Sequence, residues 1–355
     1  MQNIYNLTLK DFEDYFVNRN DKKFRATQVF EWLYRKRVNS FQEMTNLKKE
    51  VIEDLEENFT MSTIQIVKVE EDTDVQKYLF SLKDSEKVEA VLMNHDYGNS
   101  VCISTQVGCN MGCKFCESGR LKKVRNLETH EMVEQLLEIE KYCKERISHV
   151  VVMGIGEPFD NYDNLVKFIE IINNDHGIAL GSRHITVSTC GVVPKILEFS
   201  LLPYQVNLAI SLHAPTNELR NQMMPINKAY PLEVLIDTLK KYMEKTNRRV
   251  TFEYILLSGV NDKKEHAELL AHLVRGMNCY INLIPYNETN NIRFKRSKKE
   301  TILEFYDILK KNKINATIRR EFGSKISAAC GQLRSKKEEY DEIILYDRHG
   351  ESKRS

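Results

Sequence analysis

Apolar, strand-like runs alternate with helical patterns over most of the chain, and this alternation constrains the fold more than any other feature. Between two of the runs, Leu165, Phe168, Ile169 and Ile172 recur at helical spacing. Such alternation implies a parallel sheet, although the pattern alone does not separate a doubly wound sheet from an open barrel. In these folds the chemistry gathers at the carboxyl ends of the strands. The six runs are VCIST (101–105), HVVVMGIG (149–156), HITVSTC (184–190), NLAISLH (207–213), RVTFEYILL (249–257) and YINLIPYN (280–287).

Three cysteines follow the first of these runs in a C-x3-C-x2-C spacing, as Cys109, Cys113 and Cys116. Such a run lets one loop present several thiolates to an iron–sulfur cluster. Three thiolates leave one iron of a four-iron cluster without a protein ligand, and an open metal position is where substrate binds. The alternative is structural zinc, which normally takes four ligands as two cysteine pairs. The sequence has no second pair, and the nearest following histidine, His130, lies far down the next predicted helix.

This spacing, with Phe115 before the last cysteine, resembles the signature of radical S-adenosylmethionine (SAM) enzymes. Further segments, from about Asn3 to Arg334, closely resemble the RlmN family of RNA adenine methyltransferases. The resemblance implies an α/β fold with a partial (β/α)6 barrel, and a [4Fe-4S] cluster on the three cysteines. It also implies that SAM binds the open iron and is cleaved there to methionine and a 5′-deoxyadenosyl radical. The segments are VEAVLMNHDYGNSVCISTQVGC, VVMGIGEPFDN, RHITVSTCGVVPKI, LAISLHAPTNELRNQMMPIN, INLIPYN and TIRREFGSKISAACGQLR.

Composition indicates a large globular protein that does not enter a membrane. Hydrophobic residues make up 42% of the 355 positions, and the formal net charge is +1. We find neither an apolar leader nor an apolar run of about 18 residues, the length that a membrane span needs. Eight cysteines, three of them in one short run, fit a reducing cytoplasm better than a disulfide framework. We therefore expect a cytoplasmic protein, and a monomer.

Four segments are expected: a helical domain (1–60), an antiparallel β lead-in (61–97), the radical SAM core with a C-terminal catalytic loop (98–335), and a charged tail (336–355). In the first, FRATQVFEWLYRKRV combines apolar residues at helical spacing with several lysines and arginines. These charges form either a solvated face or an RNA-docking surface, and the resemblance favours docking. The basic segments 122–125, 293–299 and 334–337 are further candidates for phosphate contacts.

The ends of four strands carry the residues that the resemblance assigns to SAM. Glycines let backbone approach a ligand closely, and a carboxylate can pair with the SAM ammonium group. On local pattern alone each residue has a plainer interpretation, as a turn glycine or serine, a structural histidine or a capping asparagine. The residues are Gly156, Glu157, Ser188, Ser211, Leu212, His213 and Asn287.

Two further cysteines and an acid complete the predicted catalytic set. In the family, the cysteine matching Cys330 is methylated by a first SAM, and a second SAM yields the radical that takes hydrogen from this methyl group. The carbon then adds to adenine C2. Glu89 matches the acceptor of the C2 proton, and Cys102 releases the product through a transient disulfide with Cys330. The plainer interpretations are an inert thiol for Cys330, a core residue for Cys102 and an outward-facing carboxylate for Glu89. The cysteines that match no role are Cys143, Cys190 and Cys279.

The resemblance therefore predicts methylation at C2 of one adenosine in the peptidyl-transferase centre of 23S rRNA, and of the adenosine 3′ of the anticodon in tRNA. It implies two SAM molecules per turnover and an electron donor such as flavodoxin or ferredoxin. The nearest rival is the C8-methylating Cfr type, which uses the same two cysteines. A rival from another class is a non-enzymatic RNA-binding protein stabilised by a metal.

Overall fold

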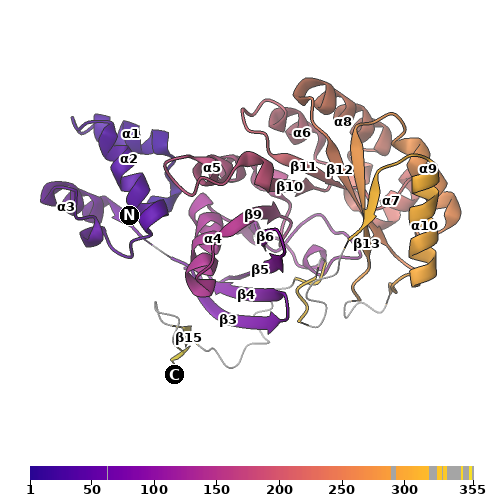
Figure 1. The fold of residues 1–355 in the computed structure, drawn as a ribbon, viewed down its shortest axis with the longest axis horizontal. Helices are drawn as coiled ribbons and strands as arrows, with labels where there is room; N and C mark the ends of the chain where they lie inside the picture. Colours follow the sequence, from indigo (N-terminus) through magenta and orange to yellow (C-terminus); the bar gives the residue numbers. More distant parts are fainter. Residues whose placement is uncertain are drawn as a thin grey trace.

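The computed structural model describes residues 1–61, 63–288, 293–319, 326–329, 331–333, 345–346 and 352–353. The predicted catalytic residue Cys330 lies outside the described residues. A ten-stranded sheet dominates the described part, with the strand order β14-β13-β12-β11-β10-β9-β6-β5-β4-β3 (Figure 1).

Seven consecutive strands of this sheet are parallel, and each pairs with the next one along the sheet. The six predicted strands are confirmed, and together with the helices they form the radical SAM barrel that the resemblance implied. The seventh strand was not predicted, because three residues are too few to give a readable pattern. The strands are β6 (Gly98–Cys102), β9 (Ile147–Val152), β10 (Ile185–Thr189), β11 (Asn207–Ser211), β12 (Val250–Leu256), β13 (Cys279–Pro285) and β14 (Ala316–Ile318).

The predicted lead-in forms the antiparallel part of the same sheet. It consists of β3 (Gln65–Asp72), β4 (Val75–Ser81) and β5 (Lys87–His95), which pair in succession. β5 also pairs with β6, and this register sets Val91 opposite Cys102. The lead-in therefore continues the barrel sheet at its first strand. Shorter strands are β7 (Gln106–Val107), which pairs with β8 (Arg125–Asn126), and β15 (Leu345–Tyr346), which pairs with β16 (Ser352–Lys353).

Amphipathic helices connect the parallel strands and bury their apolar sides in the main core. In α5, Leu165, Phe168, Ile169 and Ile172 are all fully buried, as their spacing predicted. None of the helices in the described part is both long and apolar enough to cross a membrane. The helices of this region are α4 (Thr129–Cys143), α5 (Tyr162–Asn173), α6 (Val193–Phe199), α7 (Asn217–Met223), α8 (Leu232–Thr246), α9 (Lys264–Leu273) and α10 (Lys299–Lys311).

The N-terminal segment forms a helical unit beside the sheet, drawn in indigo in Figure 1. Its helices are α1 (Leu9–Val17), α2 (Phe24–Glu31) and α3 (Lys49–Asn58). The sequence predicted no strand here, yet β1 (Gln2–Asn3) pairs in parallel with β2 (Phe59–Thr60). This short ladder joins the two ends of the helical unit, a contact between distant residues that local patterns do not reveal.

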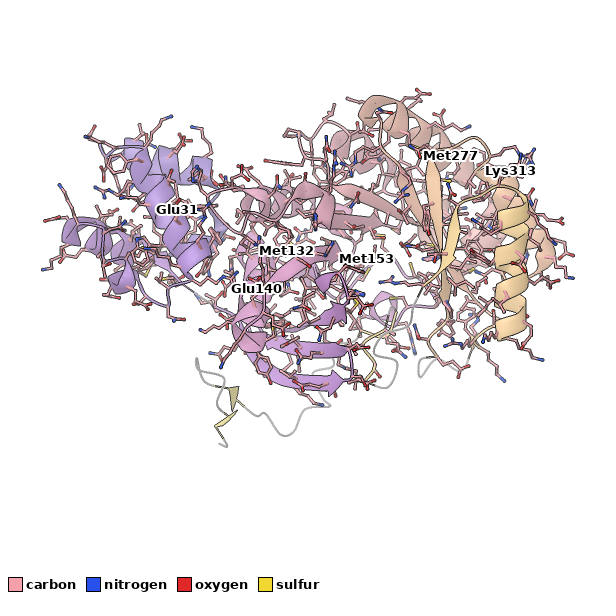
Figure 2. The ribbon with its side chains drawn as sticks, in the orientation of Figure 1. Glu31, Met132, Glu140, Met153, Met277 and Lys313 are labelled. Atoms are coloured by element: carbon pink, nitrogen blue, oxygen red, sulfur yellow. The ribbon has the colours of Figure 1, made fainter. Side chains whose placement is uncertain are left out.

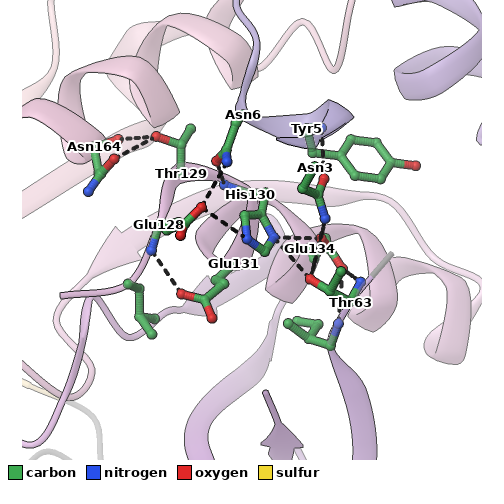
Figure 3. A network of polar contacts seen from close by, with 12 residues as sticks. Asn3, Tyr5, Asn6, Thr63, Glu128, Thr129, His130, Glu131, Glu134 and Asn164 are labelled. Atoms are coloured by element: carbon green, nitrogen blue, oxygen red, sulfur yellow. Dashed lines mark hydrogen bonds and ion pairs between the residues drawn. The ribbon is translucent and has the colours of Figure 1, made fainter. Parts of the chain in front are cut away.

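A polar network attaches the helical unit to α4 (Figure 3). The Glu134 carboxylate accepts hydrogen bonds from the side chain of Asn3 (2.8 Å) and from the amides of Thr63 (2.6 Å) and Ile64 (3.1 Å). His130 Nδ1 lies 2.9 Å from the same carboxylate. His130, the nearest histidine after the cysteine run, thus belongs to this attachment and lies outside the cysteine loop.

Candidate active site

The cysteine loop follows β6 and β7 and lines one cavity with all three of its cysteines. Cys109, Cys113 and Cys116 share this cavity, the cysteine cavity, with residues from the carboxyl ends of β9, β10 and β11. Two backbone contacts fix the loop: the Cys116 amide donates to the Cys113 carbonyl (3.2 Å), and the Lys114 amide donates to the Met223 carbonyl on α7 (3.0 Å). The short loop therefore brings three thiols to one wall of the barrel mouth.

Burial controls the protonation of these thiols. It raises the pKa of Cys109 to about 12 and also raises the pKa values of Cys113 and Cys116. Such thiols become thiolates only when a metal supplies compensating positive charge. Among the described residues, no three His, Cys, Asp or Glu side chains are grouped as a single metal ion requires. A four-iron cluster takes each thiolate on a different iron, and three cysteines that line one cavity can supply these ligands.

Glu157, just after β9, presents an anionic group to the same cavity. The side chain is 3% exposed, and its two oxygens accept hydrogen bonds from the backbone amides of Phe159 (3.1 Å) and Cys190 (2.8 Å). Burial raises the pKa of this carboxyl group, and the amide hydrogen bonds oppose that shift. The largest of these opposing contacts come from neutral groups, the amides of Cys190 and Phe159 and the side chains of Cys190 and Thr189. A buried acid held only by dipoles is suited to receive a cationic ligand such as an ammonium group.

The glycines before Glu157 are required by the close packing of two strand ends. A Cβ atom on Gly154 would lie 2.6 Å from the Ile103 carbonyl oxygen, and one on Gly156, where φ is +112°, would lie 2.7 Å from Gln106 Cβ. Gln106 Oε1 in turn accepts a hydrogen bond from the Glu157 amide (2.9 Å). The glycines therefore position Glu157 by letting its segment pack against residues 103–106.

The predicted residues at the ends of β10 and β11 divide into two groups. Ser188, Ser211 and His213 line the cysteine cavity. Leu212 is fully buried in the main core, and its amide and carbonyl are used in hydrogen bonds within the protein, the latter to Arg220 Nε (3.1 Å). The structure thus brings the flanking residues to the cavity and leaves Leu212 in the packing behind it.

His213 is held as a neutral imidazole. Its Nδ1 accepts a hydrogen bond from the Ile255 amide (3.0 Å), and its ring packs edge-on against Phe115, with 4.8 Å between ring centroids. Burial, together with the charge of Arg220, lowers the pKa of His213 to about 3. Because Nδ1 accepts, the ring proton is on Nε2. His213 therefore joins the cysteine loop to the end of β11 without adding charge.

Two residues that the sequence did not single out lie beside these groups. Arg220 of α7 is fully buried and donates hydrogen bonds to the carbonyl oxygens of Cys190 (2.6 Å), Ser211 (3.2 Å) and Leu212 (3.1 Å), which ties the ends of β10 and β11 together. Cys190, which matched no role, lines the cysteine cavity next to Glu157. An arginine in an amphipathic helix gives no sequence signal of such burial.

Glu253 of β12 is a third residue that sequence reasoning missed, and it also lines the cysteine cavity. It is 4% exposed; its Oε1 accepts from the Asn282 side chain (2.9 Å), whereas Oε2 accepts no hydrogen bond from the described residues. Burial raises the pKa of this acid, and the charge of Arg319 opposes the shift. The signal was available, because VTFEYIL is an apolar run interrupted by one acid, the same pattern that drew attention to Glu89.

A second cavity adjoins the cysteine cavity and holds two more of the predicted residues. It is lined by Cys102 and Asn287, and it shares Cys116 and Met153 with the first cavity (Met153 is labelled in Figure 2). Asn287 is 6% exposed, and its Oδ1 has no hydrogen-bond partner among the described residues. Asn287 therefore offers an acceptor in this Cys102 cavity, which Cys116 of the cysteine loop also lines.

The C-terminal loop reaches the same place. The described neighbours of Cys330, Ala329 and Gly331, both line the Cys102 cavity. The Gly331 carbonyl accepts from the amide of Glu117 (2.9 Å), and a second contact runs from Ser118 Oγ to the Leu333 carbonyl (2.7 Å). The loop that carries Cys330 is therefore hydrogen-bonded to the loop that carries the three cysteines.

Glu89 is buried in the antiparallel part of the sheet. It is 1% exposed, and its carboxylate lies 3.6 Å from Lys77 Nζ, which also pairs with Glu70 (2.5 Å). The strand register sets Glu89 on the same face of β5 as Val91, which lines the Cys102 cavity. The outward-facing interpretation of this acid is therefore wrong, although Glu89 is not itself among the residues lining that cavity.

Comparisons with known proteins agree with this arrangement. The model of the radical SAM superfamily matches residues 103–270, and the model of the ribosomal RNA large subunit methyltransferase N-terminal domain matches residues 2–61. A protein from Enterococcus faecalis named "Probable dual-specificity RNA methyltransferase RlmN" is 54% identical over 96% of this chain and 98% of its own. A protein of the same name from Listeria monocytogenes is 56% identical over 94% of this chain and 93% of its own.

A solved structure extends the agreement to the fold. The crystal structure of a radical SAM methyltransferase from Sphaerobacter thermophilus superposes with a TM-score of 0.89 at 40% identity, over 94% of this chain and 99% of that chain. Radical SAM enzymes bind a [4Fe-4S] cluster and SAM, and the buried thiols and the unpaired Glu157 carboxylate fit those two groups. The chain therefore belongs to the RlmN family of radical SAM RNA methyltransferases.

Proposed function

We propose that this enzyme methylates C2 of one adenosine in the peptidyl-transferase centre of 23S rRNA and of the adenosine 3′ of the anticodon in tRNA. It does so through a methylated Cys330 and a transient disulfide between Cys330 and Cys102. The observation that carries the proposal is the Cys102 cavity, which is lined by Cys102 and by Ala329 and Gly331, the two described neighbours of Cys330. A scheme with two cysteines requires such proximity, since thiol exchange needs the two sulfurs in contact.

The bound groups supply an electron, a methyl group and a hydrogen-abstracting radical. Cys109, Cys113 and Cys116 would hold the cluster, and Glu157 would receive the ammonium group of SAM. Ser188, Ser211 and His213 line the same cavity and would contact the rest of SAM. Asn287 would do so from the adjoining cavity, where no described residue hydrogen-bonds to its Oδ1. Two SAM molecules are used per turnover, one for the methyl group on Cys330 and one for hydrogen abstraction.

The protein residues complete the transfer. The Cys330 thiolate takes a methyl group. The carbon of that group loses one hydrogen atom to the radical that the second SAM would supply and then bonds to adenine C2, and the odd electron of this adduct would be taken up by the cluster. Glu89 accepts the C2 proton, and its neighbour Lys77 would stabilise the carboxylate until then, since an ion pair favours the charged form. The Cys102 thiolate attacks the Cys330 sulfur and forms the disulfide. The electron pair of the broken carbon–sulfur bond stays on the methylene carbon, which takes up a proton and becomes the methyl group on adenine. The target base must leave its stack to reach the cavity.

The partners in this proposal are 23S rRNA, tRNA and a small electron donor such as flavodoxin or ferredoxin. The enzyme itself would act as a monomer in the cytoplasm. Methylation at C2 is favoured over C8 because the relatives of 54% and 56% identity carry the RlmN name. Digestion of methylated RNA to nucleosides, followed by mass spectrometry against both methyladenosine standards, tests this choice.

The substitution Cys102→Ala tests the cysteine scheme directly. Methylation of Cys330 and bond formation to adenine remain possible in this variant, but no second thiolate is available to release the product. We expect a protein–RNA species that survives denaturant and high salt, with a nucleotide remnant on Cys330 after nuclease digestion. A complex held by phosphate contacts would dissociate under the same conditions.

The matched control is Cys279→Ala. Cys279 is also a buried thiol, but it lies in the main core and lines neither the cysteine cavity nor the Cys102 cavity. This variant should release methylated RNA without a trapped species. If Cys102→Ala protein carries a methyl group on Cys330 but no linked RNA, product release uses another route and the proposed role of Cys102 is wrong.

A further inference from the structure

A third cavity, of about 890 Å³, opens at the N-terminal end of the barrel strands. In Figure 2, Met277 and Lys313 mark that end, because they lie in the loops that lead into β13 and β14, whereas Met153 follows β9 at the opposite end. Arg183 comes from the segment before β10, and Arg248 and Arg249 come from the segment before β12. We call this space the arginine cavity. None of the three cysteines of the loop lines it, although its inner end shares Met153, Glu253 and Arg319 with the cysteine cavity, and the proposed reaction does not use its outer end.

The three arginines have neutral partners. Arg183 Nε donates to Gln205 Oε1 (2.9 Å), and Arg248 donates from Nη2 to Asn207 Oδ1 (2.8 Å). Arg249 lies over the ring of Tyr280, with 5.0 Å from the guanidinium carbon to the ring centroid. Within the described part of the chain, none of the three forms an ion pair with a carboxylate, in contrast to Arg125, which pairs with Asp84 (2.7 Å) and Glu131 (2.7 Å). Their positive charges are therefore not compensated locally.

Arg248 is the most constrained of the three. Its Nε is buried and has no hydrogen-bond acceptor in the described part of the chain. Burial lowers the pKa of Arg248, Tyr242 opposes this shift, and the nearby charge of Arg183 adds to it. Asn207 holds both residues, since its side-chain amide donates to the Arg183 carbonyl (2.7 Å) while its oxygen accepts from Arg248. Like charges held together beside an unsatisfied donor are costly without an anion to bind.

The end of a helix does not account for this cluster. Arg248 follows the C-terminus of α8, where free carbonyl oxygens attract cations. Two of those carbonyls are already used, because Thr246 Oγ1 donates to Tyr242 (2.7 Å) and the Asn247 amide donates to Met243 (2.8 Å). The helix end would in any case explain one arginine and leave the other two without a reason.

One acid, Glu253, is found among the described residues that line the arginine cavity. Glu253 also lines the cysteine cavity, so it lies at the inner end, where the two spaces approach each other. Arg319 lines both cavities as well, and its charge acts on Glu253. The charge of Glu253 is therefore balanced by Arg319. Among the described lining residues, no further acid balances the charges of Arg183, Arg248 and Arg249.

A row of neighbouring rings continues from Arg183 along the surface, in which His95 and Tyr97 are stacked and Tyr97 meets His149 edge-on. His184 packs on His149 (4.4 Å between centroids), His149 on Tyr97 (5.3 Å), and Tyr97 on His95 (4.6 Å). Tyr97 is 67% exposed. Exposed rings beside a basic groove are the combination that single-stranded nucleic acids bind, because bases stack while cations contact the backbone.

From these contacts we propose that the arginine cavity binds a phosphate group. Guanidinium groups match phosphate in charge and in their paired donors, and neutral amides around them add hydrogen bonds without repulsion. The phosphate belongs to the backbone of the substrate RNA, whose bases would lie along the row of rings, or to a small free phosphate. This is a contact remote from the reacting adenine, and it would help to fix the orientation of a long RNA.

The experiment compares Arg248→Gln and Arg183→Gln with Arg275→Gln in the cluster-loaded enzyme under anaerobic conditions. Arg275 is exposed and lies at the same end of the barrel, in the segment before β13, but it does not line the cavity. Arg183 is exposed, so its replacement should not impair folding even if that of Arg248 does. The first readout is the rise in melting temperature caused by sodium phosphate relative to sodium chloride at equal ionic strength. The second is the affinity for a 23S rRNA transcript as a function of salt.

If the phosphate is part of RNA, each cavity variant should bind the transcript about fivefold to tenfold more weakly, and the slope of log K against log salt should fall by about one. If it is a free anion, the phosphate-induced rise in melting temperature should be lost in both variants while RNA binding is unchanged. The proposal is overturned if both cavity variants match the wild type in both readouts, or if Arg275→Gln has as large an effect. Both readouts measure binding, so they do not depend on whether methylation proceeds as proposed.

Discussion

The two ends of the barrel carry unsatisfied charges of opposite sign. At the carboxyl end, Glu157 is buried and held by neutral donors of Phe159, Thr189 and Cys190, and one oxygen of Glu253 accepts no hydrogen bond from the described residues. At the N-terminal end, Arg183 and Arg248 hydrogen-bond only to neutral amide groups. A folded chain normally compensates buried charge within itself, so an uncompensated charge indicates the sign of a missing ligand. One barrel is thus prepared for a cation at one end and for an anion at the other.

The largest effect is expected at the carboxyl end, from replacement of a cluster ligand. Cys113→Ala removes a thiolate that no neighbouring side chain replaces, and we expect iron content to fall from about four per chain to near zero, with loss of SAM cleavage. Iron and sulfide analysis after anaerobic reconstitution measures this. The control Cys279→Ala should retain the cluster. A Cys113→Ala protein with a full, active cluster would contradict the assignment.

A smaller effect at the same end is expected from Glu157→Gln, which keeps the shape of the side chain and removes its charge. A hydrogen bond to a charged group contributes about 1.5–3 kcal/mol, so SAM should bind about tenfold to more than a hundredfold more weakly. Equilibrium binding of SAM to the reconstituted enzyme gives the ratio. Glu268→Gln, at an exposed position on α9, should bind SAM normally. Wild-type affinity in Glu157→Gln would mean that the ammonium group of SAM is bound elsewhere.

The smallest effect, and the one that joins the two ends, is expected from Glu253→Gln. Removing a buried charge whose Oε2 has no partner should stabilise the protein without SAM by about 1 kcal/mol, because the cost of desolvating the carboxylate disappears. SAM affinity should fall less than in Glu157→Gln, by a few-fold. Urea unfolding with and without SAM measures both quantities. A destabilised Glu253→Gln protein would show that the charge interaction with Arg319 outweighs the desolvation cost.

Measuring each variant with the ligand of the opposite end tests whether the two ends of the barrel are independent. Glu157→Gln should leave phosphate and RNA binding at the N-terminal end unchanged, and Arg183→Gln should leave SAM affinity unchanged. Residues without shared partners affect stability and binding independently. If either variant changes the binding of both ligands, the two ends of the barrel are coupled. The coupling would then involve the residues that line both the cysteine and the arginine cavities, which are Met153, Glu253 and Arg319.

Local patterns in the sequence were enough to predict six of the seven parallel strands, the helix α5 and the cysteine run, but not β1, β2 or β14. The six predicted strands and the helical spacing of α5 depend on residues that are close in the chain, as does the run of Cys109, Cys113 and Cys116. The position of Glu157 after β9 followed from the same reasoning, because parallel strands end at one edge of the sheet. The family resemblance supplied the pairing of Cys102 with Cys330, which no local pattern indicates.

The tertiary structure alone decided which distant residues meet. Leu212 and His213 are adjacent in sequence, yet one lies in the core and the other lines the cavity, because a left-handed φ of +58° at His213 redirects the chain. The burial of Arg220, the inward position of Glu253 and the joining of Arg183 with Arg248 depend on strand register and on how separate loops close over the barrel. These contacts link residues far apart in the chain, and their energies arise from burial and charge that exist only once the sheet has formed.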